Sequence, residues 1–248
     1  MFRGKEIDHN LDRDRIRKLL IIGVAGSVLT GAGDFLLGFA EESSGSNLAS
    51  SIMSSAQNLS DWQIITGGLL GMIGILLEGL ACFAIYRLMA DSTPKYARIY
   101  KIGIIGYIWL APVGCHLNMG ILNLAYKYLL QADVSLAEEA AKPLIYGFSI
   151  PVWVLLIILW LPAIIIQFMA FAKGYTPYPA KTKWFSVLVG IWPILIVSVI
   201  IGPHTAWGAG IGTTFLSFGN LFMFAGLLAA LPSAECFNEF RNNLKQEA

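Results

Sequence analysis

Six long apolar segments, separated by short polar connections, constrain the fold of this chain more than any other feature. They cover roughly residues 19–39, 63–89, 101–130, 144–172, 184–202 and 209–232. A helix needs about 20 apolar residues to cross a hydrocarbon layer that is roughly 30 Å thick. The pattern therefore predicts an all-α, six-helix membrane bundle that forms one domain over residues 1–248.

The basic residues are distributed unevenly among the connections. Of the 17 Lys and Arg, only Lys127 and Lys142 fall on one side of the predicted bundle, and the others fall on the side that carries both chain ends. Basic residues are retained on the cytoplasmic side during insertion. We therefore expect a multi-pass protein of the bacterial plasma membrane, with the N- and C-termini in the cytoplasm.

The composition favours a membrane protein and argues against several other classes. The chain is 56% hydrophobic and 13% charged, with a mean hydropathy of +0.65, which is unusual for a soluble domain. No block of basic residues predicts a nucleic-acid partner. The three Cys include no C-x-x-C pair, so we expect neither a disulfide framework nor a cysteine metal site.

Polar side chains inside the predicted spans lead to the functional hypothesis. An ionisable group in hydrocarbon costs at least about 2.5 kcal/mol, so it normally faces the bundle interior or a cavity. Asp34 in the first span and His116 in the third are the expected central groups of a ligand-binding site. Asn123, Thr213 and His204, which precedes the sixth span, are the expected accessory groups. The predicted site is a polar pocket open to the outside between the first, third and sixth spans.

Glu78 is a further ionisable residue inside the predicted membrane region. It extends a stripe of small residues in the second span, namely Gly67, Gly71 and Gly74. Small residues at this spacing are typical of membrane helices that pack closely against a neighbour. We therefore expect Glu78 to point at an adjacent helix, at a greater depth than Asp34.

Helical periodicity groups the remaining polar residues by face. Asn123 lies seven residues after His116 and should share its face, whereas Asn118 should point elsewhere. The last span has one face with three polar residues, Thr213, Ser217 and Asn220.

The first outer connection, about residues 40–61, is long for a compact bundle. Ser60 and Gln63 have the spacing of a capping box and should begin the second span. The connection admits two interpretations: an interfacial amphipathic turn, or a lid over an outward-facing site.

No cofactor or metal is expected. Asp34, Glu78, His116 and His204 lack the spacing of known zinc motifs such as H-E-x-x-H. No nucleotide-binding motif is present, so coupling to ATP would require another chain.

Two partial resemblances bear on function. The segment Gly33-Asp34-Phe35-Leu36-Leu37 is similar to the G-D-x-L-L segment of the membrane lysoplasmalogenase family, without the His-bearing helix expected soon after it. The layout of six spans with a first-loop lid resembles the substrate-binding components of energy-coupling-factor vitamin transporters. These resemblances imply an enzyme acting on a lipid and a small-molecule binder, respectively.

Three functional classes therefore stay open. The first is binding, with or without transport, of a small or amphipathic molecule at an outward-open polar pocket. The second is a membrane enzyme that acts on a lipid or isoprenoid, with Asp34 and His116 as acid/base partners. The third is a structural or accessory subunit that associates with a partner protein and uses its polar residues to hold helices together.

Overall fold

The computed structural model describes residues 11–41 and 47–247, and all regular structure in this part of the chain is helical. The all-α prediction is therefore confirmed for these residues. The elements are α1 (Arg13–Gly38), α2 (Leu48–Met53), η1 (Ser54–Asn58), α3 (Asp61–Ala90), α4 (Pro94–Ala111), η2 (Pro112–Leu117), α5 (Asn118–Ala132), α6 (Val134–Leu144), η3 (Ile145–Ser149), α7 (Ile150–Ala172), η4 (Ala180–Trp184), α8 (Val187–Ile201), α9 (Ala206–Thr213), α10 (Phe215–Ala229) and α11 (Ala234–Glu247).

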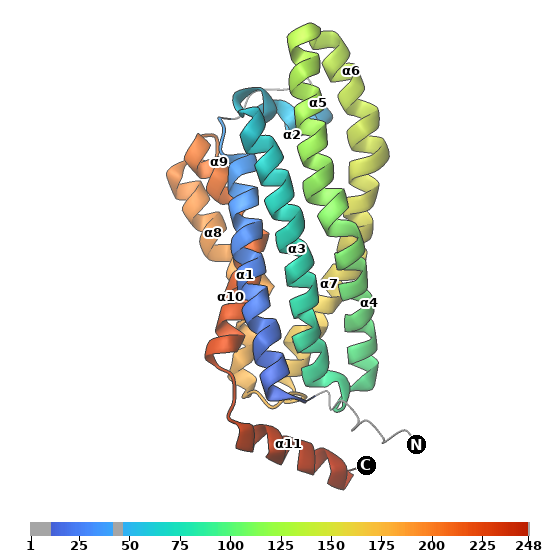
Figure 1. Cartoon of the computed structure of the whole chain (residues 1–248), viewed down its shortest axis with the longest axis vertical. Helices are drawn as coiled ribbons and strands as arrows, with labels where there is room; N and C mark the ends of the chain where they lie inside the picture. The colour runs from blue at the N-terminus through green and yellow to red at the C-terminus, as the bar shows by residue number, and fades with distance from the viewer. Residues whose placement is uncertain (1–10, 42–46, 248) are drawn as a thin grey trace, which may run out of the picture.

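The long helices run side by side along the longest axis of the molecule (Figure 1). The beginning of α1, the α3–α4 connection and α11 lie at one end, which we call the α11 end. The short helix α2 and the α5–α6 turn lie toward the opposite end, which we call the α2 end. Residues 42–46, in the middle of the first outer connection, lie outside the described residues.

Within residues 11–41 and 47–247, four helical segments are long and apolar enough to cross a membrane. They are α1, α3, the run Pro94–Ala132 and the run Val134–Ala172. A fifth is obtained if α9 and α10 are taken together, although these two helices are bent by 50°. Helix α8 has 15 residues and so is about 22 Å long, which is less than the roughly 30 Å hydrocarbon layer.

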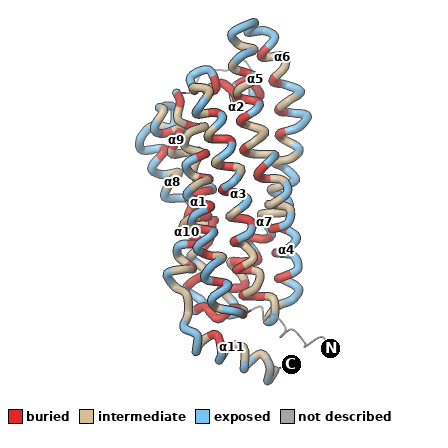
Figure 2. The backbone as a smooth tube through the Cα atoms, in the orientation of Figure 1, coloured by how far each residue is buried: buried red, intermediate tan, exposed pale blue. Residues whose placement is uncertain are grey.

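The surface of the bundle is compatible with a lipid environment. Large apolar side chains are exposed along several helices, for example Trp109 (76%), Val199 (68%) and Ile200 (77%). Exposed positions alternate with buried ones along the outer helices (Figure 2). Soluble monomers rarely expose contiguous apolar surface on this scale, so an integral membrane protein fits the surface well.

Three predicted boundaries are wrong. The fourth predicted span begins near Val134 rather than residue 144, because Asp133 caps α6 by accepting a hydrogen bond from the Leu136 amide. The fifth predicted span, expected from residue 184, begins as α8 at Val187, because η4 ends at Trp184 and the next two residues are not helical. The sixth, expected to be continuous over 209–232, is broken at Thr214. The hydroxyls of Thr213 and Thr214 bond the carbonyls of Gly210 and Ile211, and such back-bonding bends helices.

The predicted close packing of the glycine stripe is confirmed. A Cβ atom added to Gly71 or Gly74 of α3 would overlap groups on the facing helices, and Gly67 packs against Leu37 and Gly33 of α1. On α1, a Cβ at Gly33 would lie 2.6 Å from both the Gly67 oxygen and the Gly71 nitrogen. Helices α1 and α3 therefore approach backbone to backbone, which places Glu78 beside neighbouring helices.

Candidate ligand-binding site

A cavity of about 660 Å³ lies between α1, the α2–η1 segment, α5 and the α7–α9 region; we call it the wide cavity. Its wall carries the side chains of Asp34, His116 and Asn123. His116 and Asn123 are both buried, and they reach the cavity from η2 and α5 respectively. The prediction that these two residues share a face is therefore confirmed.

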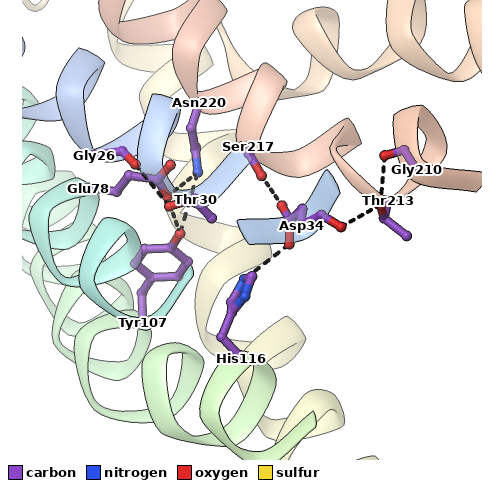
Figure 3. Close-up of polar contacts among 10 residues, drawn as sticks. All are labelled: Gly26, Thr30, Asp34, Glu78, Tyr107, His116, Gly210, Thr213, Ser217 and Asn220. Atoms are coloured by element: carbon purple, nitrogen blue, oxygen red, sulfur yellow. Dashed lines mark hydrogen bonds and ion pairs between the residues drawn. The ribbon is translucent and has the colours of Figure 1, made fainter. Parts of the chain in front are cut away.

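Asp34 and His116 form a pair across the bundle (Figure 3). The Asp34 Oδ1 atom lies 3.2 Å from the His116 Nε2 atom. The Ser217 hydroxyl on α10 donates to Oδ2 of the same carboxyl group. The Thr213 hydroxyl donates to the Asp34 backbone oxygen over 2.9 Å. Asp34 is therefore held by groups from three other elements.

The orientation of the His116 ring favours one tautomer. Its Nδ1 atom is buried without a hydrogen-bond partner, and a Cβ at Gly71 would lie only 1.8 Å from it. A proton on Nδ1 would be buried against the α3 backbone with no acceptor, which is costly. The packing therefore disfavours a proton on Nδ1 and favours a neutral imidazole whose Nε2 atom faces Asp34.

A second cavity of about 220 Å³, the deep cavity, continues from the wide cavity toward the α11 end. The two share the wall residues Asp34, Cys115, His116 and Thr213. Glu78 lies in the wall of the deep cavity and is fully buried. Because Glu78 is seven residues beyond Gly71 on α3, it lies about 10 Å deeper than the level of Gly71 and the His116 ring.

Two donors hold Glu78 in place. The Tyr107 hydroxyl donates to Oε2 over 2.6 Å, and the Asn220 amide donates to the same atom over 2.8 Å. The Tyr107 ring stacks on Trp160, with a centroid separation of 6.3 Å. The other carboxyl oxygen, Oε1, makes no hydrogen bond.

One polar face, formed by the end of α9 and by α10, contacts both Asp34 and Glu78. Each of its three residues, Thr213, Ser217 and Asn220, donates to a group on α1 or α3. The predicted common face is therefore confirmed despite the break at Thr214. Figure 3 shows two separate groups of contacts, one around Asp34 and one around Glu78, and this face supplies donors to both.

Two predicted polar residues lie away from the cavities. The Asn118 amide donates to the Ser149 hydroxyl over 2.9 Å, which joins α5 to η3 and confirms that it points elsewhere. His204 is exposed in the turn between α8 and α9 and is absent from the walls of both cavities, although its neighbour Pro203 lines the wide one. Among the five expected ligand-binding residues, the structure thus brings together Asp34, His116, Asn123 and Thr213.

The sequence interpretation did not single out Tyr107 and Trp160. Both lie within apolar helices, where an aromatic side chain is ordinary. The one available signal was the Tyr107 hydroxyl, because a phenol in the middle of a span needs a hydrogen-bond partner. Glu78 on the adjacent helix is that partner.

Helix α2 and η1 border the mouth of the wide cavity. Ser51, Ile52, Ser54 and Ser55 lie in its wall, while Met53 packs in a cluster with Tyr126 on α5. The second half of the connection ends in the predicted capping box, in which the Ser60 amide donates to the Gln63 side chain over 3.0 Å. The described part of the connection therefore lies where a lid would lie.

Lys127 fixes this segment to α5. Its Nζ atom donates to the Leu59 carbonyl over 2.7 Å and to Asp61 Oδ1 over 2.6 Å. Replacing Lys127 by Met should remove both contacts and keep the aliphatic stem. We expect at least tenfold faster amide hydrogen exchange over residues 47–60, with little change in α1. Unchanged exchange in that segment would show that apolar packing alone holds it.

Neither cavity has the ligands of a metal site. Over residues 11–41 and 47–247, no three His, Cys, Asp or Glu side chains converge as metal ligands. The Asp34–His116 pair provides only two such groups.

The comparisons with known proteins address the family. A family model described as "Family of unknown function (DUF6796)" matches residues 5–234. The chain belongs to this family. The match includes every residue that lines the two cavities. No curated protein and no solved structure matches the chain. The resemblance to the lysoplasmalogenase family therefore depends only on residues 33–37, and the resemblance to the vitamin-transporter components depends only on the layout of the spans.

Proposed function

We propose that this family member is a six-pass membrane protein that binds, with or without transport, a small or amphipathic molecule in the wide cavity. The observation that carries the proposal is the position of the Asp34–His116 pair, whose side chains are 16% and 9% exposed, in the wall of a 660 Å³ cavity. Ligand pockets typically measure roughly 300–1,000 Å³ and combine apolar walls with a few converging polar groups. The wide cavity has both properties.

The contrast with Asn118 supports ligand binding over a purely structural role. Asn118 and Ser149 satisfy each other between two helices, as polar residues that hold helices together do. Asp34 and His116 also contact each other, but both line the wide and the deep cavity. A pair that served only to join α1 to η2 would not need a cavity on either side.

The distribution of charge supports an orientation. Lys127 and Lys142 belong to the hairpin formed by α5 and α6 at the α2 end, whereas the connections rich in Lys and Arg lie at the α11 end. We propose that the α11 end, with both termini, faces the cytoplasm of a bacterial cell. The wide cavity would then face outward, and the helices α8 and α9–α10 would form the fifth and sixth passes.

Acid/base catalysis on a lipid is the second candidate, favoured by the Asp34–His116 pair itself. In known carboxylate–His pairs, the carboxylate orients the ring so that its other nitrogen reaches the substrate. Here the other nitrogen, Nδ1, faces the α3 backbone at Gly71 instead of a cavity. This orientation argues for binding over catalysis.

The proposal is tested by the variants Asp34→Asn and His116→Ala, with Asn118→Ala as the control. Each protein is purified into nanodiscs, and the molecules extracted from it are compared by mass spectrometry. We expect at least one small molecule to copurify with the wild type and to fall at least tenfold in both site variants. Asn118→Ala should lower thermal stability and retain the molecule.

Three outcomes would contradict the proposal. If folded wild type and site variants retain every molecule equally, Asp34 and His116 do not form the binding site. A chemically altered lipid formed by the wild type and not by His116→Ala would favour the enzyme. Stoichiometric copurification of another protein, with no small molecule, would favour an accessory subunit.

A further inference from the structure

The deep cavity contains a buried acid without a basic side chain nearby. Its wall carries the carboxyl groups of Asp34 and Glu78, and no Lys or Arg is among its lining residues. His116 is the single other ionisable nitrogen in the wall, and its packing favours the neutral form. The protein therefore supplies no positive charge to Glu78 within the described cavity wall.

A buried carboxyl group in this position requires a proton or a cation. Transfer of an unpaired carboxylate out of water is so costly that such groups are neutralised or paired. The donors Tyr107 and Asn220 both bond Oε2, whereas Oε1 makes no hydrogen bond. The hydroxyls of Ser27 and Thr30 also lie beside this carboxyl group. All of these neighbours are neutral, so none of them supplies the positive charge.

The remaining wall indicates which cation fits. It is mainly apolar, with Ile75 and Leu156 on opposing helices, and with the stacked rings of Tyr107 and Trp160. A hard metal ion takes about six converging oxygen ligands. Within the described residues no three His, Cys, Asp or Glu side chains converge in this way, and the Tyr107 and Ser217 hydroxyls already donate to the two carboxyl groups. An organic ammonium group is attracted to both a carboxylate and aromatic faces, and it tolerates apolar neighbours.

The deep cavity also reaches the lipid-facing surface. Ile157 on α7 and Leu216 on α10 belong to its wall, and their side chains are 55% and 39% exposed. A ligand with its charged group near Glu78 can therefore place an apolar portion against these residues. The wide cavity, which shares four wall residues with the deep one, provides a polar entrance.

We propose that the deep cavity binds the ammonium group of an amphipathic organic cation, with Glu78 as its counter-ion. The proposal rests on the proposed function, because it assigns a chemical class to the molecule bound in the same chamber. It adds that charge recognition occurs at Glu78, roughly 10 Å deeper than the level of His116.

The test uses three probes of similar shape on the full chain in nanodiscs. They are benzyltrimethylammonium, its uncharged carbon isostere neopentylbenzene, and the anion 3-phenylpropanoate. Binding is measured by tryptophan fluorescence, with empty nanodiscs as the blank, for wild type, Glu78→Gln and Asp133→Asn. Asp133→Asn removes one carboxylate at the cap of α6, away from both cavity walls, and keeps a capping side chain.

We expect the wild type to bind the ammonium probe at least tenfold more tightly than the anion. Glu78→Gln should lose at least tenfold in affinity for the ammonium probe and bind neopentylbenzene unchanged. Asp133→Asn should match the wild type. Folding of each variant is checked by its thermal transition and elution profile.

Several results would overturn the inference. Equal affinities for the cation and the anion would do so, as would a folded Glu78→Gln variant that binds the cation like the wild type. If neopentylbenzene binds and the cation does not, the chamber binds ligands but Glu78 is a neutral acid, so the proposed function survives alone. If no probe binds and no molecule copurifies, both proposals fail.

Discussion

Replacing Gly33 by Ala is expected to lower the free energy of unfolding by about 1–3 kcal/mol, the usual cost of overpacking a tightly packed core. The added Cβ would lie 2.6 Å from the Gly67 oxygen and the Gly71 nitrogen. Both are backbone atoms of α3, so no side-chain rotation can relieve the overlap. The helices α1 and α3 would have to separate, and the Asp34–His116 pair depends on their spacing.

Gly31→Ala is the matched control on the same helix. Its Cβ would meet only the Ser217 Cβ atom, at an ordinary contact distance of 3.6 Å. We expect an unchanged or slightly higher apparent Tm for Gly31→Ala, since Ala also favours the helix. Thermal unfolding followed by elution profile compares the two variants, and equal stability would show that α1 and α3 are less tightly packed than described.

Asn220→Leu is expected to lower the free energy of unfolding by about 1–3 kcal/mol, the range for leaving a buried polar group without one of its partners. The substitution removes one of the two donors to Glu78 Oε2 and places an apolar side chain beside a fully buried carboxyl group. Tyr107 would be the one hydrogen-bond donor left to that oxygen.

A double variant separates this contact from a simple volume change. In Glu78→Met with Asn220→Leu, the buried carboxyl group is absent and only the Tyr107 hydroxyl loses its acceptor. We expect the double variant to be more stable than Asn220→Leu alone, because replacing both partners of a buried polar contact is nearly neutral. The Glu78→Met single variant completes the comparison. If the stability losses of Glu78→Met and Asn220→Leu add up to the loss of the double variant, the amide–carboxyl contact contributes little.

The helical fold and much of the site could be predicted from the sequence for one physical reason. Hydrocarbon imposes a cost on every exposed polar group, so the positions of Asp34, His116 and Asn220 indicate which helix faces point inward. The glycine stripe of α3 and the shared face of Thr213, Ser217 and Asn220 follow from the same periodicity.

Local changes of helical geometry could not be predicted from that periodicity. The π-helical segments η2 and η3 shift the faces of their helices. The Trp153 indole of α7 donates to the Gly114 carbonyl in η2. The break at Thr214 depends on hydroxyl–carbonyl bonds that compete with the helix. The position of His204 along the chain predicts the same depth in the membrane as the other site residues. The structure places it in the turn between α8 and α9, where it is exposed.

If α8 forms the fifth pass, as proposed, its short length affects the bilayer beside it. Its 15 residues present a hydrophobic wall, including Trp192 and Ile196, that is roughly 8 Å shorter than an average bilayer interior. Lipids beside it should shorten or tilt their chains to avoid exposing acyl carbons to water. The leaflet would then dip beside this helix, and head groups would descend toward Ser198, which lies in the wall of the wide cavity.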